Sequence, residues 1–545
     1  MSGVVANPPP ATSVNAAADA PAFLRLATLL GLLGLLARLA AYALAPGPLV
    51  PDEDFQYLEQ AHRLALGTGL VPWEYVIGIR SWLLPGALAP VFAAARLVGG
   101  DPRIALWAVA VLLSLLSLPS IWCAMRWGQR AAGWSGAAAA GVLQAFWFEI
   151  VYFAPHATAD TIAASLLVPG LYLAGLGRPP PSRATRWLGG VLLGLTVAVR
   201  LQLAPLVLLM ALRALRRGQF QPLALGIALP ILLSGALDAV TLSYPFQSLW
   251  LYAWVNLGLG AAASFGTSPW YEYVSVKILF WSVAAVPLIA AMLIGSSRQP
   301  GLLIALAAIV VPFLLLAHHE DRFLLPALPL LLTLAGIGSA LVADHFLGES
   351  SPGGGAAAWR SSLACAGFWI VLSGVAVTHA PLWHYIYENP GMDAAERIVN
   401  ADPSACGVAM HPEAPWARMP GYARFRPGIV LYGFSPGDAA TRAAAFDYVI
   451  DDSDDGGALG RIGFTWRDCW NRETRPDWPG NLRRRICLWH REPGHGEARC
   501  DRRAAVPLVP PLPEFLGGAV LPRAQGGDGA SGSSWLGSSR LGSSR

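Results

Sequence analysis

Long apolar runs dominate the first 380 residues of the chain, and most of them lack the spacing of amphipathic helices. A helix needs about 20 apolar residues to cross a membrane, and most of the runs approach or exceed that length. The pattern therefore predicts a polytopic α-helical membrane protein with about eleven membrane helices, two of them short. The runs lie at 23–46, 104–124, 133–153, 160–177, 187–198, 201–212, 222–242, 276–294, 301–317, 323–343 and 361–380.

The two short runs, 187–198 and 201–212, are separated by Arg200. One interpretation is a pair of short helices that enter the membrane and return to the same side, and the alternative is one long kinked helix. A charge at membrane depth usually faces a cavity or another charge. Arg200 is therefore expected either to line a cavity or to pair with Asp238 or Glu149.

Arginines in the short loops predict the orientation, because cytoplasmic loops carry an excess of positive charge. With a cytoplasmic N-terminus and a re-entrant short pair, the outer segments 154–160 and 243–275 contain no arginine. The first outer loop, 47–102, contains three, so either the topology is wrong or those arginines have a function. The inner arginines would be Arg126, Arg130, Arg178, Arg183, Arg186, Arg213, Arg216, Arg217, Arg298 and Arg360.

Composition divides the chain into four parts. Residues 1–22 are predicted to form a disordered cytoplasmic leader. Residues 23–380 are predicted to form the transmembrane domain, which includes the outer loop 47–102. The charged, Trp-rich residues 381–503 are predicted to form a small extracytoplasmic α/β domain, and the Pro-, Gly- and Ser-rich residues 504–545 a disordered tail.

Two β-like segments carry the prediction for the C-terminal domain. They read GIVLYGF at 428–434 and FDYVID at 446–451, and a helix-like segment begins between them at Ser435 and Pro436. This order predicts a strand, a helix and a strand.

Overall composition excludes a soluble protein: 54% of the residues are hydrophobic, 13% are charged and the mean hydropathy is +0.47. The net charge of +4 comes almost entirely from arginine, since Lys277 is the only lysine. These arginines are scattered and form no basic stripe with stacking aromatics, so no nucleic-acid partner is predicted.

Cysteine spacing predicts no metal site, because no C-x-x-C pair occurs in the polar C-terminal part. The DDSDDG segment at 451–456 resembles the start of a calcium loop but has Ile462 where a glutamate ligand is needed. Disulfides are expected if this part is extracytoplasmic, and three pairings are open. The cysteines concerned are Cys406, Cys469, Cys487 and Cys500.

Three carboxylates follow the first apolar run directly, at Asp52, Glu53 and Asp54. One reading is a solvated helix start, where the helix dipole favours acids. The other is a general base at the membrane edge, where burial and neighbouring acids tune its pKa.

Three further groups of polar and aromatic residues lie on the same predicted side. Histidines and an arginine at 318, 319 and 322 suit a phosphate, although they could equally form a positive helix cap beside Glu320 and Asp321. The remaining groups are Trp73, Glu74 and Arg80 in the first loop, and Asn256 with FGTSPWYEY at 265–273.

These segments together resemble the glycosyltransferase 22 family of GT-C mannosyltransferases. PDEDFQYLEQAH and WEYVIGIRS are similar to the family's HPDE, Phe-Gln, TWE and RS pattern. SFGTSPWYEY is similar to YGTHPWHWY, and HHEDRFLLPALP to HKEERFLLPIYP. The resemblance covers about residues 23–345. The chain departs from the pattern at Val50, Ser268, Ala317 and His319.

The resemblance implies a GT-C fold and an inverting glycosyltransferase, typically a mannosyltransferase. The donor would be a polyprenyl-phosphate sugar, the acceptor a lipid-linked or cell-envelope glycan, and no metal or other cofactor would be needed. Asp52 would be the catalytic base, and Glu53 would orient the acceptor or the donor sugar. The donor phosphate would be bound by Arg322, His318, His319, Arg80 and Arg200. Further substrate contacts would come from Asp54, Gln56, Trp73, Glu74, Asn256, Trp270 and Tyr271.

Two rival functions remain: a lipid or sugar-lipid transporter, and a GT-C scaffold that binds glycolipid without turnover. Transporters often contain internal repeats, and this sequence shows none, which argues against a transporter. The Arg-rich, Lys-poor composition indicates a bacterium, which would place the chain in the inner membrane, with membrane lipids as partners and the active site on the periplasmic side. No sequence feature indicates an oligomeric state.

Overall fold

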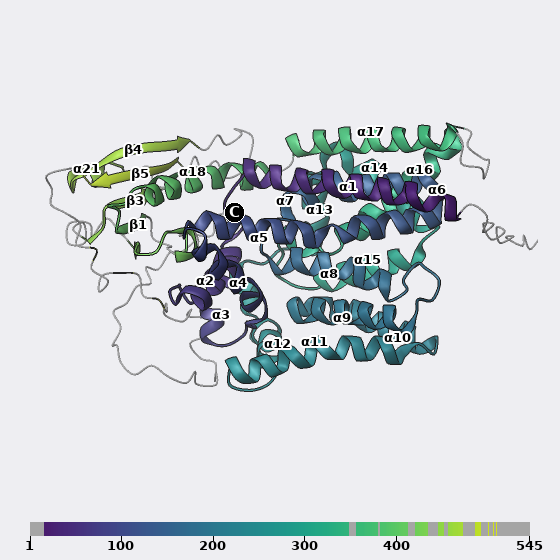
Figure 1. Ribbon diagram of the computed structural model, residues 1–545, viewed down its shortest axis with the longest axis horizontal. Helices are drawn as coiled ribbons and strands as arrows, with labels where there is room; N and C mark the ends of the chain where they lie inside the picture. Colours follow the sequence, from purple (N-terminus) through teal and green to yellow (C-terminus); the bar gives the residue numbers. More distant parts are fainter. Residues whose placement is uncertain are drawn as a thin grey trace, which may run out of the picture.

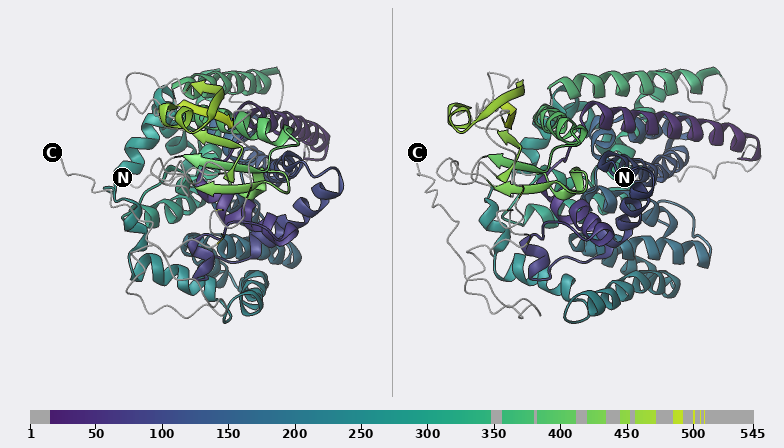
Figure 2. Two further views of the ribbon diagram at one scale, coloured as in Figure 1. Left: turned by 90° about the vertical axis from the view of Figure 1, so that its left-hand side faces the viewer. Right: turned by 60° about the vertical axis from the view of Figure 1, so that its left-hand side comes forward.

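The computed structural model describes residues 16–347, 356–379, 382–411, 420–433, 445–451, 456–471 and 485–491, together with 500, 505 and 508. A bundle of long helices occupies most of the molecule, and a small sheet lies at one end of it (Figure 1). Seen from that end, the sheet lies in front of the bundle (Figure 2).

The helical bundle confirms the predicted polytopic architecture, since each predicted apolar run coincides with helical segments. Six helices of the described chain are long and apolar enough to cross a membrane. The first, α1, begins at Ala16 within the predicted leader, because alanine favours helix. The bundle contains α1 (Ala16–Leu44), α5 (Pro102–Ser117), α6 (Pro119–Phe146), α7 (Phe148–Phe153), α8 (Ala159–Leu173), α9 (Arg183–Val199), α10 (Ala204–Arg216), α11 (Phe220–Thr241), α13 (Glu272–Trp281), α14 (Ala285–Ser296), α15 (Pro300–Leu314), α16 (Leu328–Phe346) and α17 (Ala356–His379).

A sharp turn inside α6 separates two of the predicted runs. Ala132 and Gly133 are not helical, and Gly133 has φ +61°, a conformation that glycine adopts readily. The two limbs then touch closely: a Cβ on Gly128 would lie 2.1 Å from the carbonyl oxygen of Gly136. Glycine at this contact lets the limbs pack as a helical hairpin.

The short helices α9 and α10 form a helical hairpin in place of one kinked helix. Arg200 between them is extended, with φ −141° and ψ 91°. Its side chain contacts Asp160, at the start of α8. Arg213, near the end of α10, lies instead close to Gly301 and hence to Leu176, just beyond the opposite end of α8.

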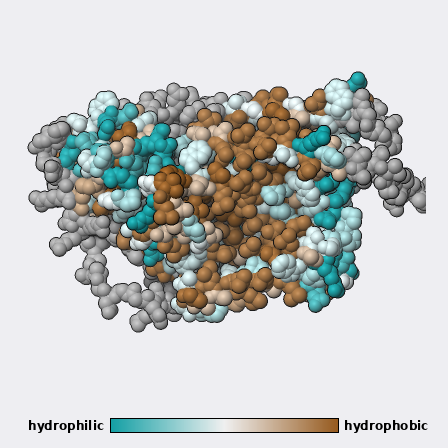
Figure 3. Space-filling view, viewed as in Figure 1, coloured by the Kyte–Doolittle hydropathy of each residue, from teal (hydrophilic) through white to brown (hydrophobic). Residues whose placement is uncertain are grey.

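Arginines gather at the end of the bundle away from the sheet, as the orientation argument expects. Arg130 and Arg178 both lie over the ring of Tyr172, at 5.3 and 4.7 Å. An apolar belt covers the middle of the visible face, and hydrophilic residues lie at both ends (Figure 3). This division is typical of a membrane protein.

Shorter helices at the sheet end position the predicted site. The first outer loop contains η1 (Glu53–Leu58), α2 (Glu59–Leu66), α3 (Trp73–Val76) and α4 (Leu83–Leu97). Between α11 and α13 lie α12 (Gln247–Ala253), η3 (Trp254–Gly258) and η4 (Ala261–Phe265), and η6 (Asp321–Leu324) precedes α16.

The C-terminal domain is a five-stranded sheet of order β2-β1-β3-β5-β4. The first three strands are parallel, and β5 runs antiparallel to both β3 and β4. The two predicted strands are confirmed as β2 and β3, while the predicted helix after Ser435 lies outside the described residues. The domain contains α18 (Leu382–Ala401), β1 (Gly407–His411), η7 (Tyr422–Arg424), β2 (Val430–Gly433), β3 (Tyr448–Asp451), α21 (Gly456–Arg461), β4 (Phe464–Asn471) and β5 (Arg485–Arg491).

Two disulfides in this domain select one of the three open cysteine pairings. Cys406 pairs with Cys500, and Cys469 pairs with Cys487 across β4 and β5. The two other cysteines, Cys123 and Cys365, are buried and unpaired.

Candidate active site

The first and last of the four predicted polar segments meet in one ion pair. Asp52 precedes η1, and Arg322 lies in η6, 270 residues further along the chain. Arg322 Nη2 donates to Asp52 Oδ2 at 2.6 Å, while Arg322 Nε donates to Glu320 Oε2 at 2.6 Å. Asp52 is 33% exposed and Arg322 is 11% exposed, so the pair faces an opening.

Glu320 links this pair to His318. His318 Nε2 lies 3.1 Å from Glu320 Oε1, and His318 Nδ1 lies 2.9 Å from the carbonyl oxygen of Gly266. Burial raises the pKa of Glu320, but the hydrogen bond from His318 and the charge of Arg322 outweigh it and hold that pKa at about 2. The hydrogen bond to Glu320 in turn raises the pKa of His318, which favours its charged form.

Arg200 belongs to the same group of charges, although neither of its two predicted partners is correct. Its Nε lies 2.9 Å from Asp160 Oδ1, an ion pair that is poorly aligned for a hydrogen bond. Arg200 also lies over the ring of Phe323, at 4.7 Å. We call Asp52, Asp160, Arg200, His318, Glu320 and Arg322 the charged cluster.

The two predicted partners of Arg200 have contacts elsewhere. Asp238 accepts hydrogen bonds from the backbone and hydroxyl of Ser248, at 2.9 and 2.6 Å. Glu149 pairs with Lys277 at 2.6 Å and accepts a hydrogen bond from Trp281. Asp160 was missed because an acid at the start of an apolar run reads as an ordinary helix N-terminus.

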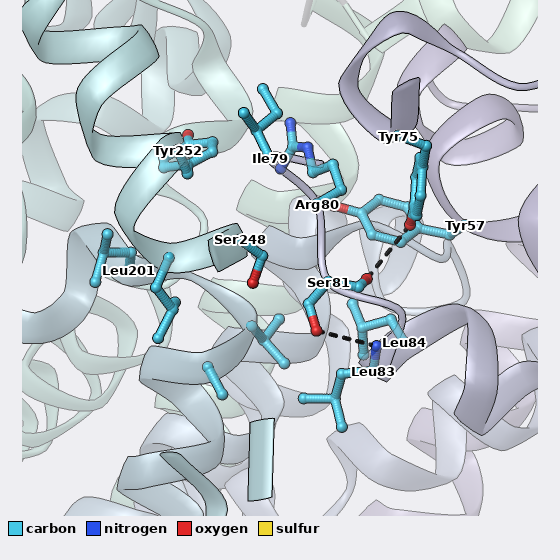
Figure 4. A pocket seen from close by; sticks show the side chains of 13 residues that line it. Tyr57, Tyr75, Ile79, Arg80, Ser81, Leu83, Leu84, Leu201, Ser248 and Tyr252 are labelled. Carbon is cyan, nitrogen blue, oxygen red and sulfur yellow. Dashed lines mark hydrogen bonds between the residues drawn. The ribbon is translucent and has the colours of Figure 1, made fainter. Parts of the chain in front are cut away.

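A cleft beside the charged cluster contains Arg80 (Figure 4). The Arg80 guanidinium lies 5.2 Å from the ring centre of Tyr252, and its Nε is buried with no hydrogen-bond partner among the described residues. Val199 and Leu201, the neighbours of Arg200, line the same cleft, so it adjoins the charged cluster. The complete lining is Tyr57, Tyr75, Ile79, Arg80, Ser81, Leu83, Leu84, Ala198, Val199, Leu201, Ser248, Leu249 and Tyr252.

Gln56 and Glu74 lie close to Arg80 and contact each other. Gln56 Nε2 donates to Glu74 Oε1 at 2.9 Å, and both side chains are buried. Burial raises the pKa of Glu74 to about 7, although the charge of Arg80 opposes the shift. Trp73, the residue before Glu74, packs in a small apolar cluster with Ile77.

Glu53 is held entirely by protein groups. Its carboxylate accepts from the backbone N–H groups of Leu49 and Ala157, each at 2.7 Å, and from His156 Nδ1 at 2.9 Å. The side chain is buried, so Glu53 fixes the first loop against the segment before α8. His156 was missed because a single histidine in a short loop matches no motif.

Asp54, a predicted substrate contact, is bound by a residue of the C-terminal domain. Arg424 Nε and Nη2 donate to the two Asp54 oxygens at 2.7 and 2.9 Å, and both side chains are 3% exposed. Nearby, Glu59 accepts from the backbone N–H groups of Tyr422 and Ala423 at 3.0 and 2.8 Å. We call the Asp54–Arg424 and Glu59 contacts the domain latch.

The remaining predicted residues lie around the cluster without joining its ion pairs. His319 packs on the ring of Tyr273 at 4.3 Å, and neither of its ring nitrogens has a hydrogen-bond partner among the described residues. Asn256 donates to the carbonyl oxygen of Tyr252. Trp270 and Tyr271 are exposed.

Comparison with known proteins gives a family match over most of the chain. The model of the Alg9-like mannosyltransferase family matches residues 32–402. GPI mannosyltransferase 3 of Yarrowia lipolytica is 29% identical over 304 residues, which cover 52% of this chain and 56% of the relative. Mannosyltransferase APTG1 of Arabidopsis thaliana is 28% identical over 52% of this chain and 54% of the relative. The chain spans about half the length of the curated relatives it matches.

A solved structure shows the fold. ArnT from Cupriavidus metallidurans, crystallised with undecaprenyl phosphate, superimposes with a TM-score of 0.50. The match covers 87% of this chain and 98% of ArnT at 14% sequence identity. This is the GT-C type of fold that the sequence predicted.

Proposed function

The chain belongs to the Alg9-like mannosyltransferase family, and on that premise we propose that it is an inverting glycosyltransferase. It moves a sugar, mannose, from a polyprenyl-phosphate donor to a lipid-linked or cell-envelope glycan. The observation that supports the proposal is the 2.6 Å contact between Asp52 and Arg322, which brings a carboxylate and a guanidinium together in one partly exposed site.

Asp52 acts as the general base. The acceptor hydroxyl gives its proton to the Asp52 carboxylate as its oxygen attacks the anomeric carbon of the sugar. The bond from that carbon to the phosphate oxygen breaks on the opposite face, and the polyprenyl phosphate leaves with the electron pair. General base catalysis of this kind typically contributes about 10²–10⁴-fold.

Arginines of the cluster and the cleft stabilise the leaving phosphate. Arg322 lies beside Asp52, and its positive charge acts across the sugar to lower the energy of the anion that leaves on the opposite face. The Nε of Arg80 and the Nη2 of Arg200 are buried with no hydrogen-bond partner among the described residues. Buried N–H groups usually have partners, and guanidinium groups bind phosphate oxygens well, which supports an anionic ligand here.

The cleft wall suits the start of an isoprenoid chain. Leu83 and Leu84 of α4 face it together with Leu249 of α12. Apolar side chains beside two arginines match a lipid phosphate better than a nucleotide sugar. Undecaprenyl phosphate in the crystal of ArnT supports the same class of donor.

The remaining polar residues position the substrate groups. Gln56, Glu74 and Trp73 contact the sugar from the α3 side, and His319 adds a donor to the phosphate. His318, whose two ring nitrogens already contact Gly266 and Glu320, acts through its charge. Glu53 and His156 hold the loop that carries Asp52. The reaction uses no metal or other cofactor.

The site faces the periplasm of a bacterium. Its charged cluster lies at the end of the bundle opposite the gathered arginines, and cytoplasmic loops are the arginine-rich ones. The two disulfides near the same end also support an oxidising compartment.

The test is transfer in proteoliposomes that contain the purified full chain and a lipid extract as acceptor. Labelled polyprenyl-phosphate mannose should label a glycolipid, and EDTA should leave the rate unchanged. GDP-mannose, as a control donor, should give no product. Transfer from GDP-mannose alone, or binding of the lipid without transfer, would refute the proposal, and the second result would favour a transporter or a scaffold.

A further inference from the structure

A stretch of 29 residues between two candidate spans contains no charged side chain. It covers residues 243–271, after the span Phe220–Thr241 and before the span Glu272–Ser296. The stretch lies at the sheet end of the molecule, next to the charged cluster: the carbonyl oxygen of Gly266 contacts His318, and Ser268 N–H donates to the carbonyl oxygen of Ala317. We call residues 243–271 the uncharged lip.

The inward face of the lip is a packed apolar surface. Leu251 in α12 and Val255 in η3 are buried against Ile77 and Ile79 of the first loop. This packing fixes the lip on the bundle.

The outward face is apolar too. Trp250, Trp254 and Leu257 follow one another at helical spacing of four and three residues, and they are 62%, 49% and 69% exposed. A helix that is hydrophobic all round is normally buried, in a core or in a membrane. The exposed side chains therefore need an apolar surrounding that the described residues do not supply.

We propose that the uncharged lip is seated in the interfacial zone of the bilayer, with Trp250, Trp254 and Leu257 against the lipid. The lip continues the lipid-facing surface of its two flanking spans, where Leu232 of α11 and Ile278 of α13 are also exposed. Tryptophan is enriched at membrane interfaces, and an apolar face of this kind enters the headgroup and acyl boundary by about 5–10 Å.

This placement fixes the height of the charged cluster relative to the membrane. Because Gly266 and Ser268 bond to His318 and Ala317, the lip and the segment that carries Arg322 move together. A lip seated among lipid headgroups holds Arg322 at the level where the phosphate of a membrane lipid lies. The inference rests on surface chemistry alone and stands whether or not the proposed transfer reaction is correct.

Site-specific labelling tests the depth of the lip. A new cysteine can be labelled selectively, because Cys123 and Cys365 are buried and the four other cysteines form disulfides. Leu257→Cys, and separately Trp250→Cys, would carry the environment-sensitive dye NBD in the full chain, reconstituted into phosphatidylcholine vesicles. Lipids with a nitroxide on the headgroup or at acyl carbon 5 would then quench the dye.

Two matched controls represent a fully aqueous and a fully lipid-facing position of the dye. Trp466→Cys replaces a 63% exposed tryptophan on β4 of the C-terminal sheet, and Leu232→Cys replaces a 59% exposed leucine in a candidate span. Both lip dyes should be quenched by the nitroxide lipids as strongly as the Leu232 dye or nearly so, while the Trp466 dye should respond to aqueous iodide instead. Lip dyes that behave like the Trp466 dye would overturn the proposal. Lip dyes that neither lipid nor iodide quenches would overturn it as well, because another part of the chain would then cover the lip.

Discussion

Two aspartates of the first loop, two residues apart, form ion pairs in opposite environments. Asp52 with Arg322 is partly exposed beside a cleft, whereas Asp54 with Arg424 is 3% exposed between two domains. Both pairs join an aspartate to an arginine, so the residue types do not separate them. Solvent exposure separates them. A carboxylate that exchanges a proton with a substrate must be accessible to that substrate, whereas one that holds a domain in place must be shielded from water.

The two carboxylates differ also in the number of hydrogen bonds that they receive from their arginine partners. Asp54 receives two hydrogen bonds from one guanidinium, the strongest geometry for such a pair. The hydrogen bond between Asp52 and Arg322 uses only Oδ2 of Asp52. The comparison therefore supports the catalytic role proposed for Asp52 and a stabilising role for Asp54, and the variants below test that division.

The largest effect is expected from Asp52→Asn. Loss of the base should lower turnover by about 10²–10⁴-fold, while stability changes by only about 0–1 kcal/mol, as is usual for exposed ion pairs. Turnover in proteoliposomes and thermal unfolding measure the two quantities. Asp101→Asn is the matched control, since Asp101 only caps α5 and asparagine caps equally well. Near-normal turnover in Asp52→Asn would remove the base assignment.

Breaking the buried pair should have the reverse profile. Arg424→Ala leaves Asp54 buried without its cation and should lower the free energy of unfolding by about 3–5 kcal/mol. Denaturant unfolding followed by tryptophan fluorescence measures the loss. Arg426→Ala is the neighbouring control, because its bonds to described residues all lie within its own domain, Asp402 and Ala405 among them. An unchanged midpoint in Arg424→Ala would show that the Asp54–Arg424 pair contributes no stability.

The domain latch should weaken as the pH rises. Burial raises the pKa of Glu59 to about 7, although three backbone N–H groups oppose the shift. The unfolded chain loses this proton near its ordinary pKa of 4.5, so stability should fall between about pH 4.5 and 7, by up to about 3 kcal/mol, and then level off. Thermal unfolding against pH measures the slope.

Glu59→Gln is the variant that sharpens this prediction. It should reduce the slope between pH 4.5 and 7 and leave the Asp54–Arg424 pair in place. Part of the slope remains, because burial also raises the pKa values of Glu74 and Glu396. A slope identical to that of the wild-type chain would assign the pH dependence to other groups, of which Glu396 is the nearest candidate because burial raises its pKa to about 8.

The smallest effect is expected from a cation without a carboxylate partner. Arg80 forms no ion pair with the described residues, in contrast to Arg424 and Arg322, so Arg80→Ala should leave stability nearly unchanged. Loss of a charge-assisted hydrogen bond of about 1.5–3 kcal/mol should instead raise the KM for the lipid-phosphate donor about 10–100-fold, with a smaller change in kcat. Arg96→Ala, an exposed arginine on α4, is the control. Equal KM values in both variants would exclude Arg80 from the donor site.

The sequence by itself determined the helical membrane architecture and the polar segments that meet in the candidate site. Long apolar runs can satisfy their backbone in a membrane only as helices, so their positions follow from composition alone. The segments PDEDFQ, WEY, FGTSPW and HHEDRF selected Asp52 and Arg322 together through their resemblance to the family's motifs.

Only the tertiary structure decided which charges pair. Asp160 with Arg200, Glu53 with His156 and Asp54 with Arg424 are separated along the chain by 40, 103 and 370 residues, and no local pattern records such partners. Desolvation differs between Asp52 and Asp54 because the C-terminal domain packs over one and not the other. The cysteine pairing has the same origin, since the sheet register places Cys469 opposite Cys487.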